Sequence, residues 1–274
     1  MIKNIKQILK RFHLFSMAKK SYHFLTKAKK NIYNRLFPTA KIILYHRIAN
    51  PENDPHLLSV SPENLYLQLK FLKENFSIVP LVQIVRWIRG RKLKNKTVAI
   101  TFDDGYADNL HHALPILKEL NIPATVFVTA GNIVSGKSFY WDVETPEADR
   151  GRPMTGEELK KLANCHLIEI GAHTMSHPKL KKISQEEQEK EIQQSKEILE
   201  KVIGMPLLSF AYPFGGLDSF DNETINLVKK SGFHYACANI HERVTNRSDI
   251  YALPRYVIRN WNLEKFKEEF NKFI

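Results

Sequence analysis

The sequence of 274 residues contains only two cysteines, Cys165 and Cys237. Two thiols are too few for a disulfide framework, and both lie in apolar stretches, so we expect reduced, buried side chains. No apolar run approaches the roughly 20 residues that a membrane-spanning helix needs. The start of the chain also lacks the apolar core and small-residue cleavage site of a secretory signal. These absences favour a cytoplasmic protein without a spanning segment.

Acidic residues are missing from the first 51 positions, where lysine and arginine recur, so most of the formal net charge of +12 belongs to the N-terminus. At the start of this segment apolar side chains fall on one side of a helical wheel and lysines on the other. The apolar residues are Ile2, Ile5, Ile8, Leu9, Phe12 and Phe15, and the lysines are Lys3, Lys6 and Lys10. We take residues 1–37 as one segment. This pattern predicts a basic amphipathic helical extension that contacts an anionic membrane surface. The alternative is a pair of helices packed on the domain or on a second subunit. We expect no nucleic-acid partner, because the segment has no recognised nucleic-acid motif.

From residue 38 to residue 274, short apolar runs alternate with amphipathic stretches. Such alternation is typical of repeated βα units and of a mainly parallel sheet or barrel. We therefore expect one α/β domain over residues 38–274, with strands near 41–45, 97–102, 124–129, 167–171, 207–211, 234–238 and 255–258.

Helix start and stop signals stand between the expected strands. A serine before a proline and two capping boxes favour three helix starts, and two glycines favour helix ends. These residues are Ser61 with Pro62, Thr155 with Glu158, Ser184 with Glu187, and Gly204 and Gly232. One helix is expected over about 185–203, with its many charges on a solvated face. The stretch 131–153 has few periodic features and predicts a long loop near the active site.

Two adjacent acids, Asp103 and Asp104, follow the strand expected at 97–102 and precede Gly105. Polar groups at the carboxyl end of a strand are where function collects in βα folds. Neighbouring carboxylates repel each other, so a cation or hydrogen bonds must compensate them. One acid can bind a metal while the other reaches the water on that metal. From these residues alone, an ordinary Asp-Gly turn with one acid as a helix cap is the alternative.

A pair of histidines, His173 and His177, follows the strand expected at 167–171. Two histidines four positions apart can approach one metal, and neutral imidazole is a common zinc ligand. Together with Asp104 they offer three mixed oxygen and nitrogen ligands, which leaves a position open for water, as in catalytic zinc sites. The ligand types suit Zn²⁺ and also admit Co²⁺, Ni²⁺ or Fe²⁺.

A third segment, residues 208–216, ends another expected strand in a turn rich in proline and glycine. Such a turn can present free backbone N–H groups to a developing oxyanion. The segment by itself favours an ordinary loop.

The motifs at residues 101–105 (TFDDG), 173–177 (HTMSH) and 212–215 (YPFG), in this order and spacing, resemble the signature motifs of the polysaccharide deacetylases, the NodB-like family. The resemblance covers about residues 40–260. It implies a single distorted, incomplete (β/α) barrel of about seven strands, here with an N-terminal helical extension. It also implies a metal-dependent hydrolase that removes acetyl groups from N-acetylated amino sugars.

The resemblance also implies a role for each motif residue. In the family, the first acid of the pair is the catalytic base, which is Asp103 here. The second acid and both histidines bind the metal, which implies that Asp104, His173 and His177 are ligands. The third motif supplies an oxyanion-stabilising backbone N–H from the residue after its proline, which is Phe214.

The sequence departs from the common family pattern in two places. Many members carry an arginine where this chain has Ala211, and many carry a C-terminal Leu-x-x-His whose histidine is the general acid. Residues 42–47 (IILYHR) resemble instead the circularly permuted branch that acts on poly-N-acetylglucosamine, in which the acid histidine precedes the acid pair; this implies that His46 is the general acid. A strand-end histidine with a purely structural role is the alternative. Arg255 is the candidate that replaces the missing arginine and keeps Asp103 ionised.

Three aromatic residues are candidates for substrate contact: Tyr140 and Trp141 in the expected loop, and Tyr212 in the third motif. Core packing is the alternative for the two loop residues. The predicted partner is an N-acetylated saccharide, either a polysaccharide or a lipid-linked precursor at the membrane surface. A small-molecule amidase or formamidase of the same superfamily, or a catalytically silent glycan-binding module, is the competing interpretation.

Overall fold

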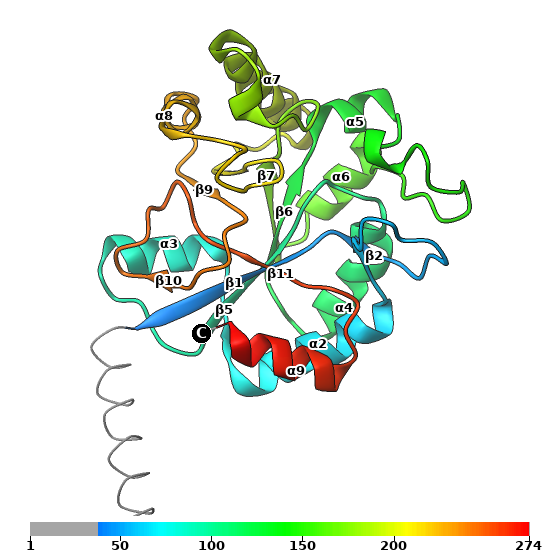
Figure 1. Cartoon of the computed structure of the whole chain (residues 1–274), viewed down its shortest axis with the longest axis vertical. Coiled ribbons are helices and arrows are strands. Elements are labelled where there is room, and N and C mark those ends of the chain that lie inside the picture. The colour runs from blue at the N-terminus through cyan, green and yellow to red at the C-terminus, as the bar shows by residue number, and fades with distance from the viewer. Residues whose placement is uncertain (1–37, 274) are drawn as a thin grey trace, which may run out of the picture. The chain divides into compact units, whose positions relative to one another are not determined.

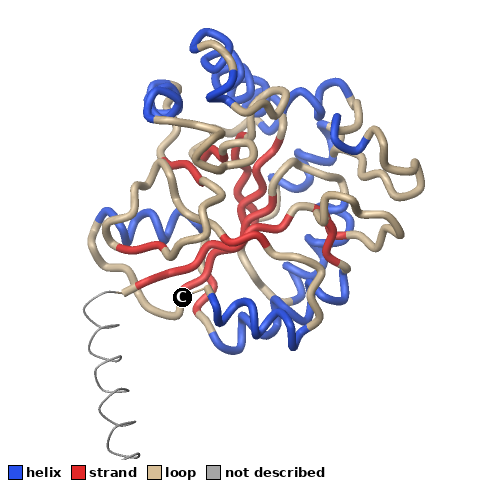
Figure 2. Tube along the Cα trace, in the orientation of Figure 1, coloured by secondary structure: helices blue, strands red, loops and turns tan. Residues whose placement is uncertain are grey.

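The computed structural model describes residues 38–273, which form an α/β domain with strands in the middle and helices around them (Figure 1, Figure 2). The main sheet follows the order β10-β1-β5-β6-β7-β8-β9, with β11 added beside β1 and β4 beside β5. All its pairings are parallel except β1 with β10. In this part of the chain the end strands β9 and β10 do not pair with each other, so the barrel is incomplete. The prediction of a distorted, incomplete barrel is confirmed.

All seven expected strands are present, and four short ones were not predicted. The expected strands are β1 (Thr39–Tyr45), β5 (Thr97–Phe102), β6 (Ala124–Val128), β7 (Ile168–Ala172), β8 (Ser209–Ala211), β9 (Tyr235–Cys237) and β11 (Tyr256–Val257). The additional ones are β2 (Arg47–Ile48), β3 (Ser59–Val60), β4 (Ser77–Ile78) and β10 (Val244–Thr245). Strands of two residues carry no periodic signal, which is why the sequence did not indicate them.

The central strands are buried on both faces, because helices cover one side and the barrel interior the other. Every residue of β5 and β6 is buried. Such strands read as continuous apolar runs rather than as alternating patterns. The six-residue register between β1 and β5, from Ala40 with Thr97 to Tyr45 with Phe102, brings the carboxyl ends of these two strands level.

The helices begin and end largely at the predicted signals. They are α2 (Pro62–Asn75), α3 (Leu81–Arg89), α4 (Leu114–Glu119), α5 (Ala130–Ser135), α6 (Gly156–Ala163), α7 (Gln185–Ile203), α8 (Asn222–Lys230) and α9 (Leu263–Lys272). Short helical turns are η1 (Asn109–Ala113), η2 (Tyr140–Asp142) and η3 (Leu180–Lys182). Ser61 caps α2, and both predicted capping boxes form at the starts of α6 and α7. Gly204 ends α7 in the left-handed conformation that glycine favours.

The prediction of one long loop over 131–153 is wrong at its start. Residues Ala130–Ser135 form the helix α5, and the turn η2 interrupts the remainder. The sequence did not indicate this helix, because it is short, has little periodicity and has glycines at positions 131 and 136. Packing explains the glycine at position 131, because a β-carbon there would lie 2.4 Å from the Met175 carbonyl oxygen.

Residues 1–37 and 274 lie outside the described residues, and the predicted basic extension lies among them. Its structure and its membrane contact therefore stay predictions. None of the helices within residues 38–273 is both long and apolar enough to cross a bilayer. Of the two cysteines, Cys237 is buried as expected, whereas Cys165 is partly exposed.

Candidate active site

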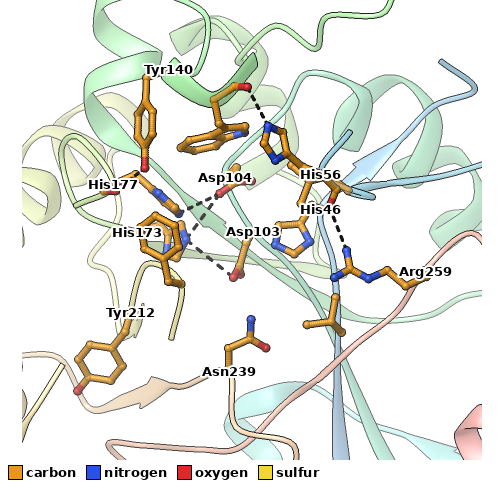
Figure 3. Close-up of a pocket in the computed structure, with 14 residues that line it drawn as sticks. His46, His56, Asp103, Asp104, Tyr140, His173, His177, Tyr212, Asn239 and Arg259 are labelled. Carbon is orange, nitrogen blue, oxygen red and sulfur yellow. Dashed lines mark hydrogen bonds and ion pairs between the residues drawn. The ribbon is translucent and has the colours of Figure 1, made fainter. Parts of the chain in front are cut away.

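A cavity of about 440 Å³ opens at the carboxyl ends of the central strands. It is lined by side chains that follow β1, β5, β7, β8, β9 and β11, as Figure 3 shows. Nine of the ten residues singled out in the sequence line it; Arg255 lies behind Asp103 instead. The lining residues are His46, His56, Leu58, Asp103, Asp104, Tyr140, Trp141, His173, His177, Tyr212, Phe214, Asn239, Val257 and Arg259.

Three of these side chains present ligand atoms to one point. The Nε2 atoms of His173 and His177 each lie 3.6 Å from Oδ1 of Asp104. One ligand atom from each residue lies within 4.8 Å of the other two. The His173 ring is oriented by a 2.8 Å hydrogen bond between its Nδ1 and the Ala211 carbonyl oxygen, which turns Nε2 toward the acids. Mixed carboxylate and imidazole donors at this spacing fit a divalent cation such as zinc.

The backbone around the ligands is held in uncommon conformations. Asp104, His177 and Phe214 all have positive φ, at 74°, 60° and 61°. A non-glycine residue in this region costs about 1–3 kcal/mol, and such strain clusters at functional sites. All three residues line the cavity.

A neighbouring carboxylate fixes the turn that carries His177. Oε2 of Glu191 in α7 accepts hydrogen bonds of 2.9 Å from the backbone N–H groups of Met175 and Ser176, and Oε1 accepts one of 2.6 Å from the Ser176 hydroxyl. The Thr174 hydroxyl oxygen accepts from the His177 N–H. These contacts hold the second histidine in place before any ligand arrives.

The first acid is paired with an arginine that is fully buried. Arg255 donates from Nη1 and Nη2 to the two oxygens of Asp103, both at 2.7 Å. Burial is the largest single influence and would raise the pKa of Asp103. The charge and hydrogen bonds of Arg255, together with the charges of His173 and His46, outweigh burial and lower that pKa. Asp103 is therefore ionised at neutral pH, next to the ligand group.

The second acid has the opposite electrostatics. Burial, and then the charge of Asp103, raise the pKa of Asp104 well above its usual range. Burial also lowers the pKa values of His173 and His177, so both rings are neutral at pH 7. Neutral imidazoles and a carboxylate that lacks a cationic partner are what a divalent cation needs from its ligands. The ligand group thus fits the metal that the sequence predicted.

His46 follows β1 and faces the cavity near Asp103 (Figure 3). Its Nδ1 atom is buried and has no hydrogen-bond partner. Burial lowers the pKa of His46 to about 4, although the charge of Asp103 opposes this shift. The ring is therefore neutral at pH 7 in the site as described. A neutral ring with a free nitrogen is suited to taking up a proton and passing it on.

The third motif contributes backbone rather than side chains. No hydrogen-bond acceptor within residues 38–273 meets the Phe214 N–H, whereas the next N–H, that of Gly215, donates to the Pro213 carbonyl oxygen. The ring of Tyr212 turns away from the cavity (Figure 3). That ring stacks on Phe220 at 4.0 Å, and its hydroxyl donates to the Tyr251 carbonyl oxygen. Tyr212 still belongs to the cavity lining, and contact of its side chain with substrate stays a prediction.

The two loop aromatics stand at the rim. Trp141 packs 4.5 Å from the His177 ring, and Tyr140 is 57% exposed. The indole N–H of Trp141 donates to the Tyr106 hydroxyl, which in turn donates to Asp142, both at 2.8 Å. This chain of hydrogen bonds ties the loop to the residue that follows Gly105. Trp141 thereby presents an oriented apolar face to the cavity.

Three polar residues of the cavity were not found from the sequence: His56, Asn239 and Arg259. They lie on irregular segments without a motif, so the sequence holds no pattern that sets them apart. Asn239 alone could have been proposed as a site residue, because it lies two residues beyond the end of β9 and functional groups collect at the carboxyl ends of strands.

Comparisons with known proteins agree with this geometry. The family model described as polysaccharide deacetylase matches residues 90–236. YxkH of Bacillus subtilis (strain 168) is 27% identical over 216 residues, covering 78% of this chain and 69% of YxkH. The poly-beta-1,6-N-acetyl-D-glucosamine N-deacetylase of Staphylococcus aureus (strain MSSA476) is 26% identical over 224 residues, covering 78% of this chain and 73% of that protein.

A solved structure shares the fold. The Streptococcus pyogenes deacetylase PplD in complex with acetate aligns with a TM-score of 0.69 at 23% identity, covering 84% of this chain and 97% of that one. The matched family segment holds the acid pair, both histidines and the third motif. The chain therefore belongs to the polysaccharide deacetylase family, and it is a metal-dependent hydrolase that removes acetyl groups from N-acetylated amino sugars.

Proposed function

We propose that the substrate is a saccharide built from N-acetylglucosamine units, deacetylated at the cavity between the aromatic rim and the acid pair. The relative from Staphylococcus aureus is named for poly-beta-1,6-N-acetyl-D-glucosamine. The oriented face of Trp141 and the exposed ring of Tyr140 suit stacking against a sugar ring. A cavity of about 440 Å³ is also larger than a formamide or another small amide requires.

Asp104, His173 and His177 would hold the divalent cation, and zinc fits their nitrogen and oxygen donors best. When bound there, the cation would polarise the acetamide carbonyl and lower the pKa of a water ligand toward about 7. The observation that carries the proposal is the ionised, arginine-paired Asp103 beside this ligand group: the closest oxygen–nitrogen approach, from Oδ2 to Nε2 of His173, is 3.9 Å.

Asp103 accepts a proton from the attacking water, and the free Phe214 N–H donates to the oxygen on which negative charge develops. The departing amine then needs a proton. His46 is neutral at the start, so it must first take up a proton during the reaction. The proton that Asp103 removes from the attacking water is the source, and His46 then donates a proton to the departing amine. The products are acetate and a free amino sugar.

We also infer that the saccharide can be lipid-linked, because a basic N-terminal segment would bring the enzyme to an anionic membrane surface. This inference rests on the sequence of residues 1–37 alone.

Acetate release from N-acetylglucosamine oligosaccharides, measured together with bound metal, tests the proposal. Asp103→Asn should keep the metal and lose turnover by at least about 100-fold, the lower end of acid–base contributions. His173→Ala should lose both metal and turnover. The matched control is His234→Ala, since His234 is exposed and lies outside the cavity. Hydrolysis of simple amides but not of oligosaccharides, or full activity of Asp103→Asn, would reject the assigned function.

A further inference from the structure

The cavity has two unlike sides. Tyr140 and Trp141 form an aromatic rim on one side, whereas Asn239 and Arg259 lie on the side away from Tyr140 (Figure 3). The catalytic roles proposed above use neither of these two polar residues. The amide oxygen of Asn239 is buried and has no hydrogen-bond partner. A polar atom buried without a partner is unfavourable, so this side of the cavity is suited to a polar ligand.

Arg259 is held in place by the backbone of one loop. Its Nη1 donates to the carbonyl oxygens of His56 and Leu57. Its Nε and Nη2 donate to no acceptor in residues 38–273, so these N–H groups remain available. The guanidinium is thus held in one orientation while some of its N–H groups have no acceptor. Such a group can bind a ligand with little loss of conformational entropy.

Arg259 also lacks a close ion-pair partner. No carboxylate of the described residues lies within 4.0 Å of it, while Arg47, Arg152 and Arg255 are paired with Asp108, Glu158 and Asp103. Burial lowers the pKa of Arg259 below its usual range, although the charge of Asp54, which lies beyond ion-pair distance, opposes this shift. A half-buried cation without a partner is costly, and an anion from a ligand would offset that cost.

The location sets where such an anion would sit. His46 and Arg259 line the same cavity, and Figure 3 shows both on the side away from Tyr140. His46 faces the departing amine in the proposed mechanism. An anionic group at Arg259 would therefore belong to the sugar that is deacetylated or to its immediate neighbour.

We propose, resting on the proposed function, that Arg259 binds an anionic group of the saccharide, a carboxylate or a phosphate, beside the scissile acetamide. Arginine is suited to this because its planar guanidinium donates parallel hydrogen bonds to both kinds of oxyanion. The preferred substrate is then an acidic saccharide rather than a neutral homopolymer. A carboxylate would come from an acidic sugar in the polymer, whereas a phosphate would come from a sugar phosphate or a lipid-linked precursor.

The test compares three probes of equal length with the metal-loaded full chain. One is a neutral N-acetylglucosamine oligosaccharide, one contains a unit that bears a carboxylate, and one ends in a sugar 1-phosphate. Acetate release gives kcat/KM for each probe. We expect at least one anionic probe to exceed the neutral one by about tenfold, as a charge-assisted hydrogen bond at a half-exposed site would give. The probe that is preferred identifies the source of the anion.

Arg259→Gln should lower kcat/KM for the anionic probes about tenfold more than for the neutral probe and so remove this preference, whereas Arg259→Lys should keep part of it. Asn239→Ala should lower kcat/KM for all probes by similar factors, because the uncharged Asn239 amide does not distinguish neutral from anionic saccharides. Arg86→Gln is the surface control, since Arg86 is exposed on α3 and lies outside the cavity.

The possible failures are distinct. Acetate release from the neutral probe without an anionic preference, or a preference that survives Arg259→Gln, would overturn the role of Arg259 alone. Equal losses for neutral and anionic probes in Arg259→Gln would show that the residue only supports the loop at His56 and Leu57, which also overturns it. Absence of acetate release from every probe would reject the deacetylase assignment on which it rests.

Discussion

Arg255 and Asp103 lie 152 positions apart in the sequence and form a two-pronged ion pair that is fully buried. The pair links the strand β5 to the segment before β11, two neighbours of β1. Arg255 also donates from Nε to the Ala238 carbonyl oxygen, so its guanidinium is held by the backbone as well as by Asp103. The Asp103 carboxylate is thereby held by the residue directly before β11 rather than by a residue of the third motif, where Ala211 stands.

Arg255→Met should destabilise the protein by about 3 kcal/mol, because it leaves the Asp103 charge buried without a partner. Turnover should fall as well, since an unpaired carboxylate becomes protonated and loses its role as a base. Adding Asp103→Asn to Arg255→Met should recover at least half of the lost stability. Denaturant unfolding of the single and double variants measures this coupling.

Arg86→Met is the matched control, because it removes an exposed arginine without an ion pair in the described part of the chain. Additive effects of Arg255→Met and Asp103→Asn on stability would contradict the pairing.

The sequence predicted the features that are marked by a long apolar run or by a motif. Strands such as Thr97–Phe102 are long apolar runs with a motif at the end, so both the strand and the acid pair after it were predicted. The Arg255 pairing was also predicted, from the absence of the motif arginine at position 211. Its geometry now supports that assignment, while the catalytic roles remain proposals.

Other features could not be predicted, because they depend on contacts between distant segments. Arg259 becomes a cavity residue only when the loop at His56 and Leu57 packs beside β11. The sequence also does not show that the ring of Tyr212 packs on Phe220. Sequence spacing does not say to which side a turn residue points its side chain.

Asp104→Asn should stabilise the metal-free protein by about 1 kcal/mol, a common size for a stabilising substitution, because it removes a buried acid that lies beside the Asp103 charge. Asp104 is buried beside Asp103 and has positive φ, a conformation that asparagine tolerates well. With saturating zinc the order should reverse, since only the wild type gains stability by binding the metal. Thermal unfolding with a chelator and with zinc measures both. A variant that is less stable than the wild type without metal would show that Asp104 has a compensating partner.

Tyr106→Phe should raise KM about fivefold with a smaller effect on kcat, as expected for the loss of about one hydrogen bond. The hydroxyl of Tyr106 orients Trp141 and is buried under the loop, so its removal frees the indole without touching the acid pair. The matched control is Tyr235→Phe. Tyr235 is equally buried and its hydroxyl donates to Glu169, another carboxylate, outside the cavity. Equal KM values for both variants would contradict the positioning of Trp141.

Phe214→Gly separates the backbone of Phe214 from its ring. Glycine adopts the φ of 61° without strain and keeps the N–H that is proposed to stabilise the oxyanion. We therefore expect kcat within about threefold of wild type, whereas loss of an oxyanion donor costs about 100-fold or more. KM should rise, because the ring packs 4.9 Å from His177 at the cavity wall. Steady-state kinetics measures both constants, and a 100-fold fall in kcat would mean that the ring, and not the N–H alone, supports the reaction.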